Sequence, residues 1–293
     1  MKQIFGTKEW ADATLDIQRG CEHGCRYCYA KAEAVRFGLP EIVRRSWGRP
    51  TPLMNNAKLK KLLRAGKPKR IMFPAHHDVT CLNVAHCMGA LFQLIKAGHD
   101  VLVVSKPNPD LITWMCQSIN PVLEVKNHIE FRFTIGSSTD KTLIFWEPHA
   151  PSLGDRLASL IIAQDAGYKT SVSIEPMLDT CPEKVVAVVR PYVTEAIWIG
   201  LPNFLAQRLA LNGEPEYVRN AGKDLMASFT DDVVQRIYNN LKAEPLIQWK
   251  ESMKKRLGLE LATKSPGAGG REGGKQKTED RGQKTERNRK GEE

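Results

Sequence analysis

The sequence predicts an α/β fold: a partial (β/α)6 TIM-like barrel of parallel strands with a C-terminal helical extension and a disordered tail. Strand-like segments alternate with helix-like segments through the first two thirds of the chain. Several strand-like segments are apolar throughout, which is typical of parallel strands covered on both faces. Polar or glycine-rich residues follow each of them, at the end where such barrels carry their functional residues. A doubly wound open sheet is the alternative, but the sequence lacks the G-x-G-x-x-G turn that favours it.

Six segments are predicted to be strands. The first alternates in polarity and the others are apolar or β-branched; they cover residues 13–17, 70–73, 100–105, 129–135, 170–174 and 196–199. Helices are predicted between them, several ended by glycine, over residues 30–37, 56–65, 84–97, 109–119, 153–166 and 182–190. Alternation at this spacing is typical of parallel βαβ units.

The alternation ends near residue 200, so we expect three parts: a barrel core over residues 1–200, a C-terminal extension over 201–263 that packs on the barrel, and a tail over 264–293. In the extension, residues 231–242 are predicted to be helical, 246–250 a final strand or the start of a helix, and 251–257 a basic amphipathic turn or two. The tail is rich in glycine and charged residues, and such a composition cannot bury a core.

The chain has 293 residues and a formal net charge of +10. This charge is compatible with a phosphate-bearing or nucleic-acid partner, and equally with a solvated basic surface that has no such partner. No apolar run reaches the length of a membrane span, and the N-terminus lacks the apolar region of a signal peptide. We therefore expect a cytoplasmic protein with reduced cysteines.

Three cysteines lie within eight residues: Cys21, Cys25 and Cys28, spaced C-x3-C-x2-C. An odd number of thiols this close together cannot all pair as disulfides, so the cluster indicates a metal site. Zinc with His23 as a fourth ligand is one possibility, although so short a loop would have difficulty directing these side chains at one tetrahedral centre. An iron–sulfur cluster fits better, and three thiolates leave one iron of a four-iron cluster without a protein ligand.

The segment Gly20–Ala30, with the aromatic Tyr27 directly before the third cysteine, resembles the radical S-adenosyl-L-methionine (SAM) enzymes. The resemblance implies that Cys21, Cys25 and Cys28 bind a [4Fe-4S] cluster and that SAM completes the coordination of the open iron. It further implies reductive cleavage of SAM, abstraction of a hydrogen atom from a substrate by the resulting 5′-deoxyadenosyl radical, and an electron donor such as flavodoxin or ferredoxin.

Polar side chains at the other strand ends should converge on the same rim. They include His77, Lys106, Thr134, Ser137 and Glu175. Lys106 is suited to pair with a carboxylate, and Thr134 or Ser137 to bind a ribose hydroxyl, although such a serine or threonine is more often a turn residue.

His76 precedes His77, and adjacent side chains of an extended chain point to opposite sides. We therefore expect only one of the two histidines, His77, to face the site, where it would contact substrate or SAM. Cys81 lies just past the second strand and is a candidate hydrogen-atom donor. The remaining cysteines lack metal-ligand spacing.

Further segments are similar to the spore photoproduct lyase-like branch of the radical SAM enzymes. They are Val103–Lys106, Arg132–Ile135, Trp146–Leu157 and Asp165–Tyr168, within a likeness that covers residues 15–178. The resemblance implies that Lys106 contacts the methionine carboxylate of SAM and Thr134 its ribose, and that Glu147 and Arg156 order the cofactor-binding rim.

The chain departs from this branch after the second strand. The lyase that repairs the thymine dimer carries a hydrogen-donating cysteine there, whereas this chain reads Pro74–Asp78 with Ala75 near that place. This departure argues against dimer repair as such. The resemblance, together with the basic charge, implies a nucleobase or nucleotide substrate. The alternatives are a zinc-stabilised basic nucleic-acid-binding protein without catalysis, and a redox protein whose cluster only relays electrons.

Overall fold

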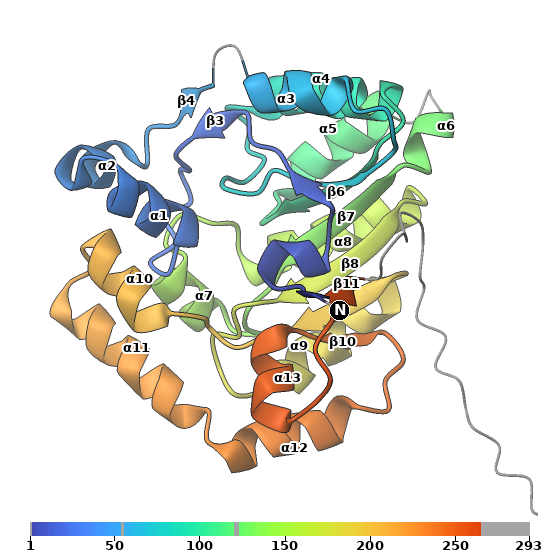
Figure 1. Ribbon diagram of the computed structural model, residues 1–293. Coiled ribbons are helices and arrows are strands. Elements are labelled where there is room, and N and C mark those ends of the chain that lie inside the picture. The colour runs from blue at the N-terminus through green and yellow to red at the C-terminus, as the bar shows by residue number, and fades with distance from the viewer. Residues whose placement is uncertain (1, 54–55, 120–122, 265–293) are drawn as a thin grey trace, which may run out of the picture.

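The computed structural model describes residues 2–53, 56–119 and 123–264 (Figure 1). Seven strands form one sheet in the order β10-β9-β8-β7-β6-β5-β2, and every neighbouring pair is parallel. The sheet curls into a half-barrel, which confirms the predicted fold class. The strands are β2 (Ala13–Thr14), β5 (Arg70–Phe73), β6 (Asp100–Ser105), β7 (Ile129–Thr134), β8 (Lys169–Ile174), β9 (Ala196–Ile199) and β10 (Ile247–Trp249).

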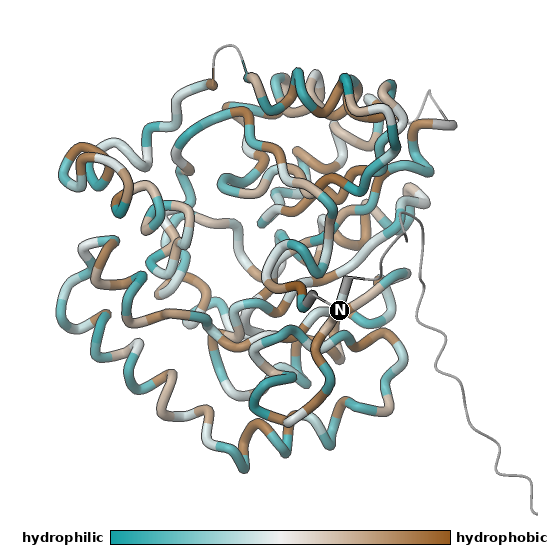
Figure 2. Tube along the Cα trace, viewed as in Figure 1, coloured by the Kyte–Doolittle hydropathy of each residue, from teal (hydrophilic) through white to brown (hydrophobic). Residues whose placement is uncertain are grey.

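Helices cover the convex face of the sheet, and the main core lies between the two layers. These helices are α3 (Ala57–Leu63), α4 (Val84–Lys96), α5 (Pro109–Ile119), α6 (Leu123–Lys126), α8 (Leu153–Asp165) and α9 (Pro182–Val189). Along β7, Phe131 and Phe133 enter this core, because alternate side chains of a strand point to opposite faces. Figure 2 shows apolar residues gathered along the strands and polar residues on the outer turns of the helices.

The strand count corrects the prediction of six. The seventh strand, β10, lies in the predicted C-terminal extension and pairs with β9, with Ile247 opposite Ile197. Three residues are too few to show the period of a strand. The first strand, β2, is in turn shorter than predicted and ends at Thr14. Just beyond it, the Asp16 carboxylate accepts the backbone N–H groups of Ala75 and His76 at 2.9 and 2.6 Å.

The remaining helices lie near the loop between β3 and α1, or belong to the C-terminal part of the chain (Figure 1). The alternation that predicts helices elsewhere did not reveal α2 (Pro40–Ser46), α7 (Asp140–Trp146), α10 (Leu205–Asn212) or α11 (Glu216–Ser228). The other elements are α1 (Tyr29–Phe37), α12 (Asp231–Leu241) and α13 (Glu251–Leu257), the 3-10 helices η1 (Gly6–Glu9) and η2 (Arg190–Tyr192), and the antiparallel pairs β1 (Lys2–Gln3) with β11 (Thr263–Lys264) and β3 (Gln18–Arg19) with β4 (Thr51–Pro52).

Helices α1 and α10 pack side by side, although residues far apart in the sequence form them. One follows the cysteine loop near edge strand β2, and the other follows β9, next to edge strand β10. Their contact therefore joins the segment after the cysteine loop to the segment after β9. The predicted disordered tail lies outside the described residues, apart from Lys264 in β11.

None of the helices in the described part of the chain combines the length and the apolar character that crossing a bilayer requires.

A buried ion-pair network lines the inside of the half-barrel. Glu130 on β7 accepts hydrogen bonds from Arg70 at 2.6 Å, Arg132 at 3.0 Å and Ser171 at 2.6 Å. Burial alone would raise the pKa of Glu130, but the charges of Arg132 and Arg70 outweigh it and lower this pKa below its ordinary value. Arg132 is only 3% exposed, so its charge depends on this carboxylate.

We predict that Glu130→Gln lowers the free energy of unfolding at neutral pH by about 3 kcal/mol, because it leaves the Arg132 charge buried without a counter-charge. A carboxylate with a lowered pKa stabilises the fold above its unfolded pKa, and this contribution is lost as the pH falls through the lowered value. The difference between wild type and variant should therefore shrink below the ordinary carboxyl pKa of 4.5. Urea unfolding across this range measures it, with exposed Glu260→Gln as control; a difference independent of pH would contradict the prediction.

Candidate active site

The cysteine loop runs from β3 into α1, and two glycines fix its path. Gly20 has φ +91°, and a Cβ atom there would lie 2.6 Å from the carbonyl oxygen of Trp47. Gly24 has φ +64°, and a Cβ atom there would lie 2.9 Å from the His149 ring. Only glycine adopts these conformations without strain and allows this close an approach.

A cavity of about 370 Å³ lies against this loop, and all three cysteines of the motif line it. Tyr27, His77, Lys106, Thr134 and Glu175 line the same cavity, so residues from the cysteine loop and from the ends of β5, β6, β7 and β8 meet in one place.

Both adjacent histidines also line the cavity, although one was expected to point away. His76 is 3.2 Å from Asp16, measured from Nδ1 to Oδ2. Nε2 of His77 accepts the backbone N–H of Ile17 at 3.3 Å.

Two predicted site residues lie elsewhere. Ser137 is fully buried and contacts Thr139 at 3.3 Å between the hydroxyl oxygens, and it does not line the cavity. Cys81 is exposed and is likewise not part of the cavity wall. The structure therefore does not bring the candidate hydrogen donor and the cysteine motif together.

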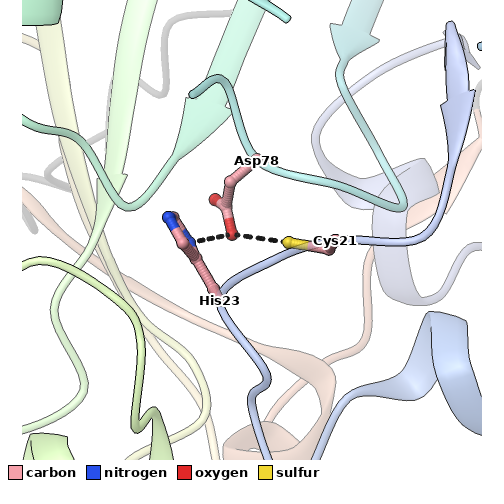
Figure 3. Close-up of side chains that lie close together, drawn as sticks. All are labelled: Cys21, His23 and Asp78. Carbon is pink, nitrogen blue, oxygen red and sulfur yellow. Dashed lines mark hydrogen bonds and ion pairs between the residues drawn. The ribbon is translucent and has the colours of Figure 1, made fainter. Parts of the chain in front are cut away.

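Asp78 connects the cysteine loop to the strand ends (Figure 3). Its Oδ2 lies 2.8 Å from Nδ1 of His23, 3.8 Å from Sγ of Cys21 and 3.4 Å from Nζ of Lys106. Its Oδ1 accepts the backbone N–H of Lys106 at 2.7 Å. Burial alone would raise the pKa of Asp78, but the charges of Lys106 and His23 hold this pKa well below its usual range. No local sequence pattern marks Asp78 as a site residue.

A second buried pair supports the loop from behind. Arg156 is 2.5 Å from Glu147, between Nη2 and Oε2, and both side chains are fully buried. The Tyr27 hydroxyl donates to the other oxygen of Glu147. Arg156 also donates to the backbone carbonyls of Pro151 at 2.8 Å and Thr134 at 3.1 Å. These contacts place Glu147 and Arg156 behind the cavity wall, where they hold Tyr27 and the end of β7.

The cysteine thiols fit a soft metal group. Burial raises the pKa of Cys21 to about 12 and also raises the pKa values of Cys25 and Cys28. The thiolate forms therefore need positive charge beside them, which bound iron would supply. Three cysteines on one cavity wall are the donor set of an iron–sulfur cluster with one open iron.

A mononuclear metal site is the other arrangement that the structure offers. One ligand atom from each of Cys21, His23 and Asp78 lies within 4.8 Å of the others, and all three residues are buried. However, the Asp78 oxygen that faces this group also faces the Lys106 ammonium at 3.4 Å. A dication there would be repelled by the neighbouring ammonium group, so this geometry favours an ion-paired Asp78 over a ligating one.

Helix α10 also holds the cysteine loop in place, which the sequence did not reveal. The Asn212 amide donates to the carbonyls of Arg26 and Cys28 at 2.8 and 3.0 Å. Arg26 in turn pairs with Glu214 at 2.9 Å. These contacts join residues more than 180 positions apart in the chain, so no local sequence pattern indicates them.

The fold and site define a parallel α/β half-barrel that presents three cysteines at the cavity beside its strand ends. A scan against protein-family models finds no match, and neither does a search of curated proteins.

Among solved structures the chain is similar to spore photoproduct lyase, the branch that the sequence resembles. The matches include a cysteine-to-serine variant with 18% identity and a TM-score of 0.47, covering 69% of this chain and 58% of that one. A tyrosine-to-phenylalanine variant has 15% identity and a TM-score of 0.49, and the match covers 72% of this chain and 62% of that one. A cysteine-to-alanine variant with dinucleoside spore photoproduct has 17% identity and a TM-score of 0.43, with coverages of 68% and 58%. The chain thus spans about three fifths of the length of these proteins. Because these identities and TM-scores are low, activity and residue roles have to be argued from the site itself.

We predict that Asp78→Asn lowers the free energy of unfolding by about 3 kcal/mol, because the buried Lys106 ammonium loses its counter-charge. The double variant Asp78→Asn/Lys106→Met should lose less, since no uncompensated charge remains. Urea unfolding of both proteins, with exposed Asp224→Asn as control, measures the difference. A double variant that is less stable than the single one would contradict this pairing.

We predict that Asn212→Ala loosens the cysteine loop and lowers the free energy of unfolding by about 2 kcal/mol, because two partly buried carbonyls lose their donor. Hydrogen–deuterium exchange should then become faster in residues 26–31, with little change in the barrel strands. Exposed Asn220→Ala on α11 is the control. Unchanged exchange in the loop would show that α10 does not hold it.

Proposed function

We propose that the protein is a radical SAM enzyme that binds a [4Fe-4S] cluster through Cys21, Cys25 and Cys28 and abstracts a hydrogen atom from a nucleobase or nucleotide. The observation that carries the proposal is that the three cysteines share one cavity wall with Lys106 and Thr134. When bound, such a cluster supplies the electron that cleaves SAM to the 5′-deoxyadenosyl radical.

The residues around the cysteines would bind and orient SAM. Lys106 remains a cation because Asp78 raises its pKa well above the usual value, even though burial alone would lower it. Its ammonium is therefore suited to the methionine carboxylate. Thr134 lines the cavity at the end of β7, where its hydroxyl is suited to a ribose hydroxyl. The apolar and aromatic residues of the lining limit the access of water, and a radical intermediate requires this protection.

Substrate class, reductant and location belong to the same proposal. The net charge of +10 supports a phosphate-bearing substrate and an acidic electron donor such as flavodoxin or ferredoxin. All seven cysteines lie in the described part of the chain, and none is paired with another there. Free thiols support a reducing compartment, the cytoplasm.

The grouping of Cys21, His23 and Asp78 favours a second candidate, a zinc-stabilised nucleic-acid-binding protein without catalysis. Such a protein would be colourless, hold one zinc ion, and bind nucleic acid with a strong salt dependence. Metal analysis separates the two candidates directly.

We predict that protein reconstituted without oxygen holds iron and sulfide, and forms 5′-deoxyadenosine from SAM when dithionite is added. Cys25→Ala should abolish this product, because it removes one of three cluster ligands. Cys181→Ser is the matched control, since this cysteine precedes α9 and does not line the cavity. A zinc-containing protein, or a cluster that forms no 5′-deoxyadenosine, would overturn the proposal; the latter result would favour electron relay.

A further inference from the structure

Arg208 on α10 is the starting point, because its charge faces the cavity without a counter-charge in contact. The other cations of the wall are matched: Lys106 pairs with Asp78, and Lys250 lies 2.5 Å from Glu9, measured from Nζ to Oε2. Within the described residues, Arg208 makes no hydrogen bond or ion pair, and its guanidinium lies 5.7 Å from the Tyr29 ring. Glu175 also lines the cavity but is not within ion-pair distance of it.

Burial supports this reading of Arg208. Burial lowers the pKa of the Arg208 guanidinium, and the charge of the nearby Glu175 offsets that effect only in part. Burying a charge without a partner is unfavourable, so an arginine held this way is stabilised when an anion enters the cavity. Its planar group matches a phosphate with two parallel hydrogen bonds.

The two residues directly before α10 add the other groups that a nucleotide requires. Asn203 lines the cavity, and its side-chain amide is a group that hydrogen-bonds base edges. Phe204 follows it, 74% exposed, with a left-handed backbone at φ 54°. A bulky residue in this conformation is strained, and such strain is found mainly at functional sites. Phe204 is not part of the cavity wall, but it directly follows a residue that is, and an exposed aromatic ring there is a typical platform for a stacked base.

We propose that Arg208 binds a phosphate group of the substrate, with Asn203 and Phe204 beside it contacting the base, so that the cavity takes a phosphorylated nucleotide rather than a free nucleobase or nucleoside. The inference rests on the proposed function, and it places the substrate against α10, whereas SAM would be held at Lys106, after β6.

The sheet topology separates the two anion-binding positions. Lys106 follows β6, whereas Arg208 lies on the helix after β9, and β7 and β8 lie between these strands. At about 4.8 Å between neighbouring strands, β6 and β9 are roughly 14 Å apart along the sheet. Lys106 already pairs with Asp78, whereas no carboxylate of the described residues pairs with Arg208, so a SAM carboxylate at Lys106 would leave Arg208 available to a second anion.

The test uses the full chain with its cluster reconstituted without oxygen, and calorimetric titration with deoxynucleoside 5′-monophosphates, the matching deoxynucleosides, and SAM. Wild type should prefer the monophosphates. Arg208→Gln should weaken their binding about 10- to 100-fold, the effect of losing a charge-assisted hydrogen bond, and leave the binding of nucleosides and SAM unchanged. Arg208→Lys should retain part of the preference, because it keeps the charge without the planar group.

Arg219→Gln is the matched control, because this arginine is exposed on α11 and outside the cavity. Three results would overturn the inference: no preference of wild type for monophosphates, an equal loss for nucleosides and monophosphates in Arg208→Gln, or weaker SAM binding in that variant, which would assign the guanidinium to the SAM carboxylate. Wild type that forms 5′-deoxyadenosine but shows one of these results refutes only this inference. Wild type that forms none refutes the proposed function itself.

Discussion

The buried carboxylate of Asp78 is the interaction on which the arrangement of the site depends. It contacts Cys21 and His23 in the cysteine loop and Lys106 at the end of β6, and it belongs to the segment that follows β5. One side chain therefore sets the distance between the candidate cluster ligands and the candidate SAM cation. Because both charges are buried, the pair is stable only while both partners are present, so the loop cannot drift from the strand ends without a large loss of stability.

The second constraint is the open edge of the half-barrel. The edge strands β2 and β10 do not pair with each other, so the sheet leaves a gap that another element has to cover. Polar bonds join the segments beside the two edges: Lys250, directly after β10, contacts Glu9, which precedes β2. On α10, Asn212 binds the loop carbonyls, and the carbonyl of Leu211 accepts a hydrogen bond from Arg44 on α2 at 3.0 Å. The helix after β9 therefore also fixes the segment that carries the third cysteine.

This dependence explains what the sequence could and could not predict. The cysteine spacing and the strand ends at Lys106 and Thr134 are local patterns, and the structure brings those residues to one cavity. Asp78 and Asn212 act through single contacts between distant segments, which leave no periodic signal. The short β10 was ambiguous for a related reason, since three residues show neither a strand nor a helix period. Sequence patterns thus predicted the barrel and the metal ligands, but not the side chains that hold them in place.

The cations of the cavity wall are of two kinds, and the difference between them indicates where ligands bind. Lys250 is 2% exposed and contacts Glu9 and the carbonyl of Gly6, so its charge is used in holding the N-terminal segment against the barrel. Arg208 is only partly buried and has no such contact, which a stable fold tolerates because water still reaches it. Its guanidinium lies 5.7 Å from the Tyr29 ring, but none of its N–H groups hydrogen-bonds to a neighbouring segment within the described residues. Its place on the cavity wall is best explained by an anion that enters from solvent.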